Sequence, residues 1–222
     1  MAGVYLYDDV NNIPDGILNE TFSLMPPERQ KRALRYRYEI DRNLCILSYW
    51  LLLYGLKRDF GISKPPSFNY GENGKPYLVN YNDVFFNISH CKEGVVCAVS
   101  DTEVGVDIQN VMPFDMAVAK RVCTNNELEQ LAVCQNPERL FCRIWTIKES
   151  FIKQYGCSIA DPLNTIYAQS IYEQLRNNAA SFWAAHYHVC CFGAGQGAVQ
   201  KINFENCISK TTNKKSHKGE VI

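Results

Sequence analysis

The chain has 222 residues, 46% of them hydrophobic, and 23 lysines and arginines balance 23 aspartates and glutamates. This length accommodates one large domain or two small ones with an ample core. Zero net charge argues against a protein that coats nucleic acid, because such proteins carry a marked basic excess. The ten cysteines form no C-x-x-C pair, which argues against a structural zinc site. We interpret them as buried free thiols of a reducing compartment.

No targeting or membrane segment is evident. The first residues carry neither the basic nor the apolar region of a signal peptide. The most apolar stretch, 47–56, is far too short to cross a bilayer. We therefore expect a cytoplasmic protein.

The first part of the chain combines one strand with helices. Val4 and Leu6 alternate with tyrosines as in a strand. Two prolines and a glutamate at 26–28 predict the start of a helical region. The apolar spacing over 44–54 predicts a core-facing helix, and the prolines and glycines of 64–82 predict turns.

Strands and helices then alternate in groups. Three strands, separated by turn signals, predict an antiparallel meander at 84–88, 95–99 and 104–109. Helices are predicted at 114–122, 126–133 and 137–155, the last ending at Gly156. Further strands are predicted at 165–171, 182–192 and 198–204. This order predicts an α+β fold with halves at 1–102 and 103–209 and a solvated tail at 210–222.

The strand at 105–109 carries two polar positions. Side chains alternate along a strand, so Asp107 and Gln109 share one face. A carboxylate beside an amide oxygen could form half of a site for a hard cation. A strand with one solvated face explains the pattern equally simply, and these five residues alone favour that explanation.

The helix at 137–155 places Trp145, Glu149 and Lys153 on one face, because they stand four residues apart. A carboxylate flanked by a ring and an ammonium could belong to a reactive site. A surface ion pair between Glu149 and Lys153 is an equally good interpretation.

Other polar residues have similarly open roles. Ser89 and His90 lie at a strand end and could donate to a phosphate, although turn backbone could also satisfy this histidine. Lys75 stands on a turn, Gly74-Lys75-Pro76, that is not a phosphate-binding loop of the Walker type. Glu127 fits a helix-capping box, and capping is favoured over catalysis. The two histidines at 186 and 188 are interpreted as structural.

Four of these motifs, taken in order, resemble the Sfp-type 4′-phosphopantetheinyl transferases over roughly residues 27–156. The motifs are Gly74-Lys75-Pro76, Asn87-Ile88-Ser89-His90, Gly105-Val106-Asp107-Ile108-Gln109 and Trp145-x-x-Lys148-Glu149-x-x-x-Lys153. Each motif alone is weak or moderate, and all four in order are strong.

The resemblance implies a monomer of two similar α+β halves related by a pseudo-twofold, each with a small antiparallel sheet packed on a helix. Coenzyme A would bind in the cleft between the halves. Its phosphopantetheine arm would move to a serine of an apo acyl or peptidyl carrier protein, releasing adenosine 3′,5′-bisphosphate. Fatty acid, polyketide and nonribosomal peptide synthesis are all compatible. Family carriers are acidic, and the basic run at 29–37 could dock them or form a solvated helix face.

The resemblance also implies roles for individual residues. Mg²⁺ would be held by Asp107 and Glu149, with Gln109 or a water in the place where the family often has a glutamate. Glu149 would also be the base for the incoming serine, while the role of Glu127 stays open. Contacts to coenzyme A are implied for Arg42, Lys75, Ser89, His90, Lys148 and Lys153.

Gln109 leaves one negative charge fewer at the metal than the family glutamate, so weaker metal affinity with retained activity is expected. Two alternatives remain. One is an impaired relative that binds coenzyme A or a carrier without transfer, and the other is an unrelated Mg²⁺-dependent phosphohydrolase.

Overall fold

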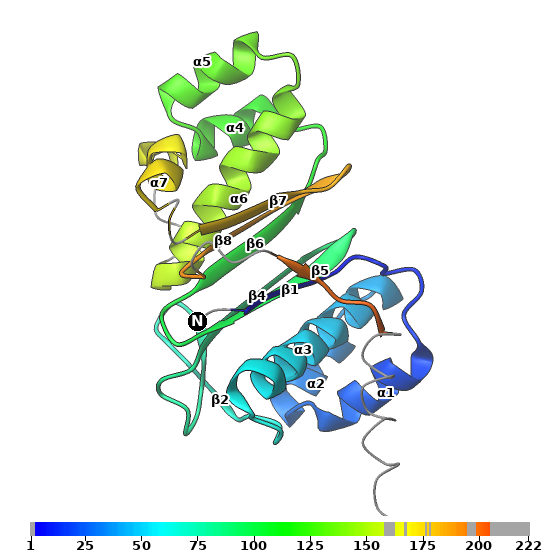
Figure 1. Ribbon diagram of the computed structural model, residues 1–222. Coiled ribbons are helices and arrows are strands. Elements are labelled where there is room, and N and C mark those ends of the chain that lie inside the picture. The colour runs from blue at the N-terminus through cyan, green and yellow to red at the C-terminus, as the bar shows by residue number, and fades with distance from the viewer. Residues whose placement is uncertain are drawn as a thin grey trace, which may run out of the picture.

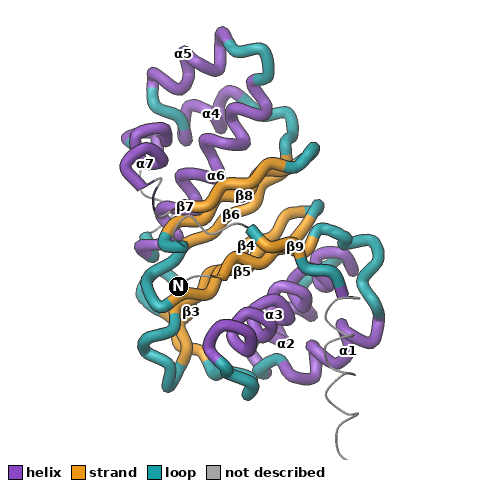
Figure 2. The backbone as a smooth tube through the Cα atoms, in the orientation of Figure 1, coloured by secondary structure: helices purple, strands orange, loops and turns teal. Residues whose placement is uncertain are grey.

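The computed structural model describes residues 3–157, 163–166, 168–175, 177, 179–194 and 199–204. These residues form two β-sheets that face each other across the middle of the molecule, each with helices on its outer side (Figures 1 and 2). The predicted α+β class is therefore confirmed. A pseudo-twofold relation between the halves stays a prediction, as do the half boundaries and the tail at 210–222, which lies outside the described residues.

The first sheet and its helices come mainly from the N-terminal part of the chain. In order, the elements are β1 (Gly3–Tyr7), α1 (Asp15–Leu24), α2 (Pro27–Leu34), α3 (Glu39–Phe60), β2 (Phe68–Tyr70), β3 (Pro76–Leu78), β4 (Phe85–Cys91) and β5 (Gly94–Ser100). The sheet order is β4-β5-β1-β9, with β9 (Gln200–Lys201) parallel to β1 and the other pairs antiparallel. β2 and β3 form a separate hairpin.

The second sheet and its helices follow β5. The elements are β6 (Gly105–Asn110), α4 (Met116–Val122), α5 (Asn125–Val133), α6 (Pro137–Tyr155), a 3₁₀ turn (Leu163–Thr165), α7 (Ala168–Leu175), β7 (Ala179–Trp183) and β8 (Tyr187–Phe192). The sheet is antiparallel in the order β6-β8-β7. The long helix α6 packs on its outer face (Figure 1).

Both sheets are buried on two faces, which places three layers of apolar side chains in the molecule. One layer lies between α3 and the first sheet and another between α6 and the second sheet. The third lies between the sheets and includes Leu6 and Val96 from the first and Val106, Ile108 and Val189 from the second. Alternate residues of each inner strand therefore point to different cores.

Several sequence predictions are wrong in instructive ways. The predicted three-strand meander breaks after β5, because β6 pairs with β8 in the other sheet. The strand predicted over 165–171 is instead the end of the 3₁₀ turn and the start of α7, whose Ala168 and Ile171 pack three residues apart into the core. The segment 182–192 is a hairpin rather than one strand. Its turn was not predicted because it contains no glycine or proline.

The C-terminal strand and the cysteines also depart from expectation. β9 is only two residues long, shorter than the strand predicted over 198–204, and pairs with β1 of the first sheet. All nine cysteines in the described part of the chain are free thiols. Cys157 is exposed and Cys91 and Cys134 are half-buried, so only the remaining six are core thiols. No described helix is long and apolar enough to span a membrane.

Gly105 sets how closely α6 lies on β6. A Cβ at this position would stand 2.1 Å from the backbone oxygen of Ser150 and 2.2 Å from the backbone nitrogen of Gln154. Since backbone cannot move aside cheaply, only glycine allows this approach. Asp107, two residues further along β6, is thereby held beneath the helix.

Candidate active site

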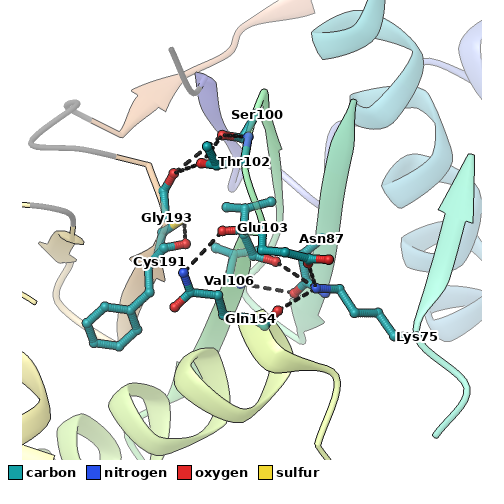
Figure 3. A network of polar contacts seen from close by, with 11 residues as sticks. Lys75, Asn87, Ser100, Thr102, Glu103, Val106, Gln154, Cys191 and Gly193 are labelled. Carbon is teal, nitrogen blue, oxygen red and sulfur yellow. Dashed lines mark hydrogen bonds and ion pairs between the residues drawn. The ribbon is translucent and has the colours of Figure 1, made fainter. Parts of the chain in front are cut away.

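The site forms where β4, an edge strand of the first sheet, lies beside β6, an edge strand of the second (Figure 2). The Asn87 side-chain oxygen accepts a hydrogen bond from the backbone N–H of Val106 at 3.0 Å (Figure 3). Two residues further on, Ser89 Oγ donates to Asp107 Oδ1 at 2.7 Å. These bonds bring the Asn-Ile-Ser-His motif of one half against the Gly-Val-Asp motif of the other.

Helix α6 adds two charged side chains to Asp107. Lys153 Nζ lies 2.5 Å from Asp107 Oδ1, 3.2 Å from Ser89 Oγ and 3.9 Å from Glu149 Oε2. Asp107 and Glu149 are each only 4% exposed. The four-residue spacing of Glu149 and Lys153 thus places them on a common face directed at the site rather than at solvent.

Two carboxylate oxygens of this cluster are unsatisfied. Asp107 Oδ2 and Glu149 Oε1 are buried and have no hydrogen-bond partner among the described residues. Burial raises the pKa of Glu149, and the nearby Asp107 raises it further, against the opposing effect of Lys153. Unpaired buried acceptors are unfavourable, and a hard cation would satisfy both.

The donor set fits Mg²⁺. Its members are two carboxylates and Gln109, whose half-buried side chain lies on the same strand as Asp107, two residues further along. The described residues hold no cluster of three or more acidic, histidine or cysteine ligands. Because Mg²⁺ commonly keeps several waters and takes only one or two carboxylates from the protein, this smaller set is sufficient.

A basic cavity of about 320 Å³ adjoins the acidic cluster. Its lining includes Arg29, Arg32, Ser89, His90 and Lys153. The Arg29 guanidinium lies over the Phe68 ring at 4.4 Å, and burial lowers its pKa. Such a set of forked and compact cations suits phosphate groups.

The surroundings of His90 favour its neutral form. Burial lowers its pKa below the ordinary value of 6.5, and the positive charges of Arg32 and Lys153 lower it further, while Asp41 and Asp107 oppose this shift. A bound anion would offset those positive charges. The pKa of His90 would therefore rise when a phosphate enters the cavity.

A second cavity, of about 360 Å³, shares Pro76, Asn87 and Lys153 with the first. Its lining also includes Gly74 and Lys75 of the turn between β2 and β3 and Gly156 at the end of α6. The two cavities together can receive an elongated molecule that carries several phosphates, with the acidic cluster alongside.

The structure thus brings together Asp107, Glu149, Lys153, Ser89 and His90, which the sequence singled out. The structure does not place Arg42 with this group, because Arg42 lines neither cavity.

The structure instead supplies two basic residues of the run 29–37, which the sequence suggested for carrier docking and not for contacts to coenzyme A. Arg29 and Arg32 of α2 stand three residues apart and therefore face the same way. The signal that could have found them is this spacing within the basic run, read together with the helix start at Pro27.

Lys148 has a structural role in place of the implied contact with coenzyme A. It is fully buried, and its three ammonium protons go to Glu127 Oε2 at 2.5 Å, Val122 O at 2.7 Å and Leu163 O at 3.1 Å. No proton is left for a coenzyme A phosphate. Glu127 in turn caps α5 through Thr124, so the capping interpretation is confirmed.

Lys75 and His188 also have structural partners. The Lys75 ammonium lies 2.5 Å from Glu103 Oε2 and 2.6 Å from Gln154 O, so its charge is engaged by protein groups although its side chain also lines the second cavity. His188 is buried with Nε2 2.9 Å from Ser181 Oγ, and burial lowers its pKa to about 3. It is therefore a neutral core residue.

A buried acidic pair beside adjoining basic cavities has the chemistry to hold a phosphate ester together with a cation. The family model of the 4′-phosphopantetheinyl transferase superfamily matches residues 103–196. The chain is 32% identical over 151 residues to 4′-phosphopantetheinyl transferase Sfp of Bacillus subtilis (strain 168), covering 66% of this chain and 67% of that protein. It is 34% identical over 160 residues to 4′-phosphopantetheinyl transferase gsp of Aneurinibacillus migulanus, covering 71% and 67%.

A more distant relative is a yeast protein. The L-aminoadipate-semialdehyde dehydrogenase-phosphopantetheinyl transferase of Candida glabrata is 26% identical over 187 residues, 80% of this chain and 70% of that protein. The chain therefore belongs to the 4′-phosphopantetheinyl transferase superfamily, and it is an enzyme of the transferase class. The aligned region spans about two thirds of the length of these relatives.

Proposed function

We propose that this chain transfers the phosphopantetheine arm of coenzyme A to a serine of an apo acyl or peptidyl carrier protein in a Mg²⁺-dependent reaction. Family membership supports the transfer itself. One structural observation supports the roles assigned to residues: the acidic cluster holds two unpartnered carboxylate oxygens and directly adjoins the basic cavity.

In the proposed reaction, the carrier serine oxygen bonds to the phosphorus that bears the pantetheine arm. The bond from that phosphorus to the bridging oxygen breaks, and adenosine 3′,5′-bisphosphate leaves with the electron pair. Such phosphoryl transfer depends chiefly on positioning and on neutralising negative charge. Mg²⁺, held by Asp107 and Glu149 with Gln109 or water completing its ligands, would supply Lewis acidity at the pyrophosphate.

The chain's own side chains complete the reaction. Lys153, already between the two carboxylates, would neutralise charge that develops on the pyrophosphate. Arg29, Arg32 and His90 would hold the remaining phosphates in the basic cavity. Glu149, whose pKa burial raises, would accept the proton of the serine hydroxyl, because a raised pKa makes a carboxylate a better base at neutral pH.

The carrier would dock beside the basic cavity. Arg29 and Arg32 line that cavity, and Arg32 is exposed, as are Lys31, Arg35 and Arg37 further out on the same run. This outer row offers positive charge to an acidic carrier. Replacing Arg35 and Arg37 by glutamate should raise the KM for the carrier and leave the KM for coenzyme A unchanged; an unchanged carrier KM would place the docking surface elsewhere.

We further propose a cytoplasmic monomer, so light scattering should give the chain mass of 25.4 kDa and a doubled mass would contradict it.

The deciding experiment incubates the protein with coenzyme A, Mg²⁺ and an apo carrier protein and then weighs the carrier by mass spectrometry. A gain equal to the phosphopantetheine group is expected. Unmodified carrier with coenzyme A bound to the enzyme would indicate a binding protein, and release of inorganic phosphate would indicate a hydrolase.

Two variants test the assignment of the base. Glu149→Ala should abolish transfer while circular dichroism stays unchanged. Glu129→Ala removes an exposed carboxylate on α5 and serves as the matched control. Near-normal transfer by the Glu149 variant would remove this residue from the mechanism.

A further inference from the structure

Lys75 stands at the crossing of three segments of the chain. It lies in the turn between β2 and β3, and its ammonium contacts Glu103 Oε2 at 2.5 Å, Gln154 O at 2.6 Å and Val104 O at 3.4 Å (Figure 3). These partners belong to the segment between the two sheets and to the end of α6. Since an ammonium has three protons, the protein occupies them all.

The contact with Gln154 caps a helix. The last carbonyls of a helix lack intrahelical partners and carry partial negative charge, so a cation there is favourable. Asn73 of the same turn donates to the Gly156 oxygen at 2.9 Å. Gly156 ends α6 with a φ of 65°, and a Cβ there would stand 3.3 Å from Lys75 Cδ. The β2–β3 turn thus packs directly on the end of α6.

The segment between the sheets is a fixed anchor for this contact. Gln154 Nε2 donates to the backbone oxygen of Glu103 at 3.1 Å. On its other side, a Cβ at Gly193 would stand 2.1 Å from the same oxygen, so the two backbones touch. Ser100 and Thr102 both donate to the Gly193 oxygen at 3.4 Å (Figure 3).

Lys153 immediately precedes Gln154, so whatever holds the end of α6 also holds Lys153 against Asp107. We propose that Lys75 is a positioning residue for phosphopantetheinyl transfer: it ties the β2–β3 turn and the segment between the sheets to the last turn of α6 and thereby orients Lys153. It does not itself bind a coenzyme A phosphate. This inference rests on the proposed function, because the consequence for Lys153 is a consequence for transfer.

Direct phosphate binding by Lys75 makes the opposite predictions. If Lys75 bound coenzyme A, neutralising Glu103 would release the ammonium and tighten coenzyme A binding. If Lys75 positions α6, neutralising Glu103 loosens the contact and slows transfer. The Glu103 side chain is 53% exposed, so its own effect should be the smaller of the two.

The experiment measures transfer kinetics and, by calorimetry, coenzyme A binding in the full chain. Lys75→Met should lower kcat about tenfold, because Lys153 acts mainly on charge that develops in the transition state. The KM for coenzyme A should change less than about twofold, because cations of the first half hold its phosphates in the ground state. Glu103→Gln should lower kcat about two- to threefold, and the double variant should be no slower than Lys75→Met alone. Lys75→Arg, which keeps the charge, should recover most of the rate.

Two results would overturn the inference. One is a tenfold weaker binding of coenzyme A to Lys75→Met with kcat unchanged, and the other is tighter coenzyme A binding to Glu103→Gln. Lys64→Met, which removes an exposed lysine of the same half, is the matched control and should match the wild type.

Hydrogen exchange separates this inference from the proposed function. In Lys75→Met, the amides of the last turn of α6 should exchange about tenfold faster than in the wild type or in Lys64→Met. Unchanged exchange would refute positioning even if transfer occurs. A wild-type protein that fails to modify any carrier would refute the proposed function, while accelerated exchange would still support the helix contact of Lys75.

Discussion

Replacing Glu149 by glutamine should stabilise the metal-free protein and abolish its response to Mg²⁺. The Glu149 carboxylate is 4% exposed, and its Oε1 has no hydrogen-bond partner among the described residues. Its nearest cation, Lys153, is 3.9 Å away. Glutamine keeps the shape, removes the buried charge and offers N–H donors to a cluster that contains the unpartnered Oδ2 of Asp107.

The magnitude follows from the unsatisfied oxygen. A buried acceptor without a partner costs about 1–3 kcal/mol, and the attraction of Lys153 offsets part of that cost. We expect glutamine to raise the free energy of unfolding by about 1 kcal/mol, which raises the unfolding midpoint of a chain of this size by about 2–4 °C. Mg²⁺ at about 100 times its dissociation constant should stabilise the wild type by about 2.7 kcal/mol and leave Glu149→Gln unchanged.

The effect of the substitution should depend on pH. Because the pKa of Glu149 is raised in the folded protein from its ordinary value of 4.5, folding favours the protonated carboxyl. The stability that this group contributes is therefore fully present below pH 4.5 and is lost as the pH rises through the folded pKa. The advantage of glutamine should be greatest near pH 8 and should vanish towards pH 4.5.

Thermal unfolding followed by circular dichroism, with EDTA or with Mg²⁺, measures both effects. Glu129→Gln, an exposed substitution on α5, should shift the midpoint negligibly and keep the Mg²⁺ response. A metal-free Glu149→Gln variant that is less stable than the wild type at pH 8, or one whose midpoint Mg²⁺ raises as much as that of the wild type, would contradict an unpartnered Glu149 carboxylate that binds Mg²⁺.

Three further substitutions test neighbouring parts of the site. Lys148→Met leaves Glu127 buried without its cation, so urea unfolding should show a loss of about 3–5 kcal/mol; a loss below about 1 kcal/mol would contradict a structural role. Coenzyme A should bind more tightly as the pH falls from 8 to 6, because a bound phosphate raises the lowered pKa of His90. Calorimetry in buffers of different ionisation heat should detect proton uptake that His90→Gln abolishes, and uptake retained by that variant would assign the proton elsewhere. Gln109→Glu adds a charged oxygen ligand and should lower the Mg²⁺ concentration for half-maximal activity, a conclusion that an identical Mg²⁺ titration would reject.

Local patterns predicted the elements that carry the site. The helix over 137–155 and its end at Gly156 match α6 in full, because apolar spacing and a C-terminal glycine are local signals. Strand pairing could not be predicted from local patterns, because β6 pairs with β8, some 80 residues later in the chain, and not with the preceding strand β5. The partner strands β5 and β8 are both buried on two faces. The alternation of apolar and polar residues that would indicate a partner is therefore absent from them.

The three lysines of the family motifs show where sequence reasoning could have gone further and where it could not. Lys148 and Lys153 are five residues apart on one helix, so they point about 140° away from each other. Once Glu149 and Lys153 are assigned to the site, this angle alone directs Lys148 elsewhere, and the structure places it in a buried pair with Glu127. The spacing of residues gives no comparable prediction for Lys75. Its partners Glu103 and Gln154 are 28 and 79 residues away in the chain, and only the packing of the turn on the end of α6 shows that its charge is already in use.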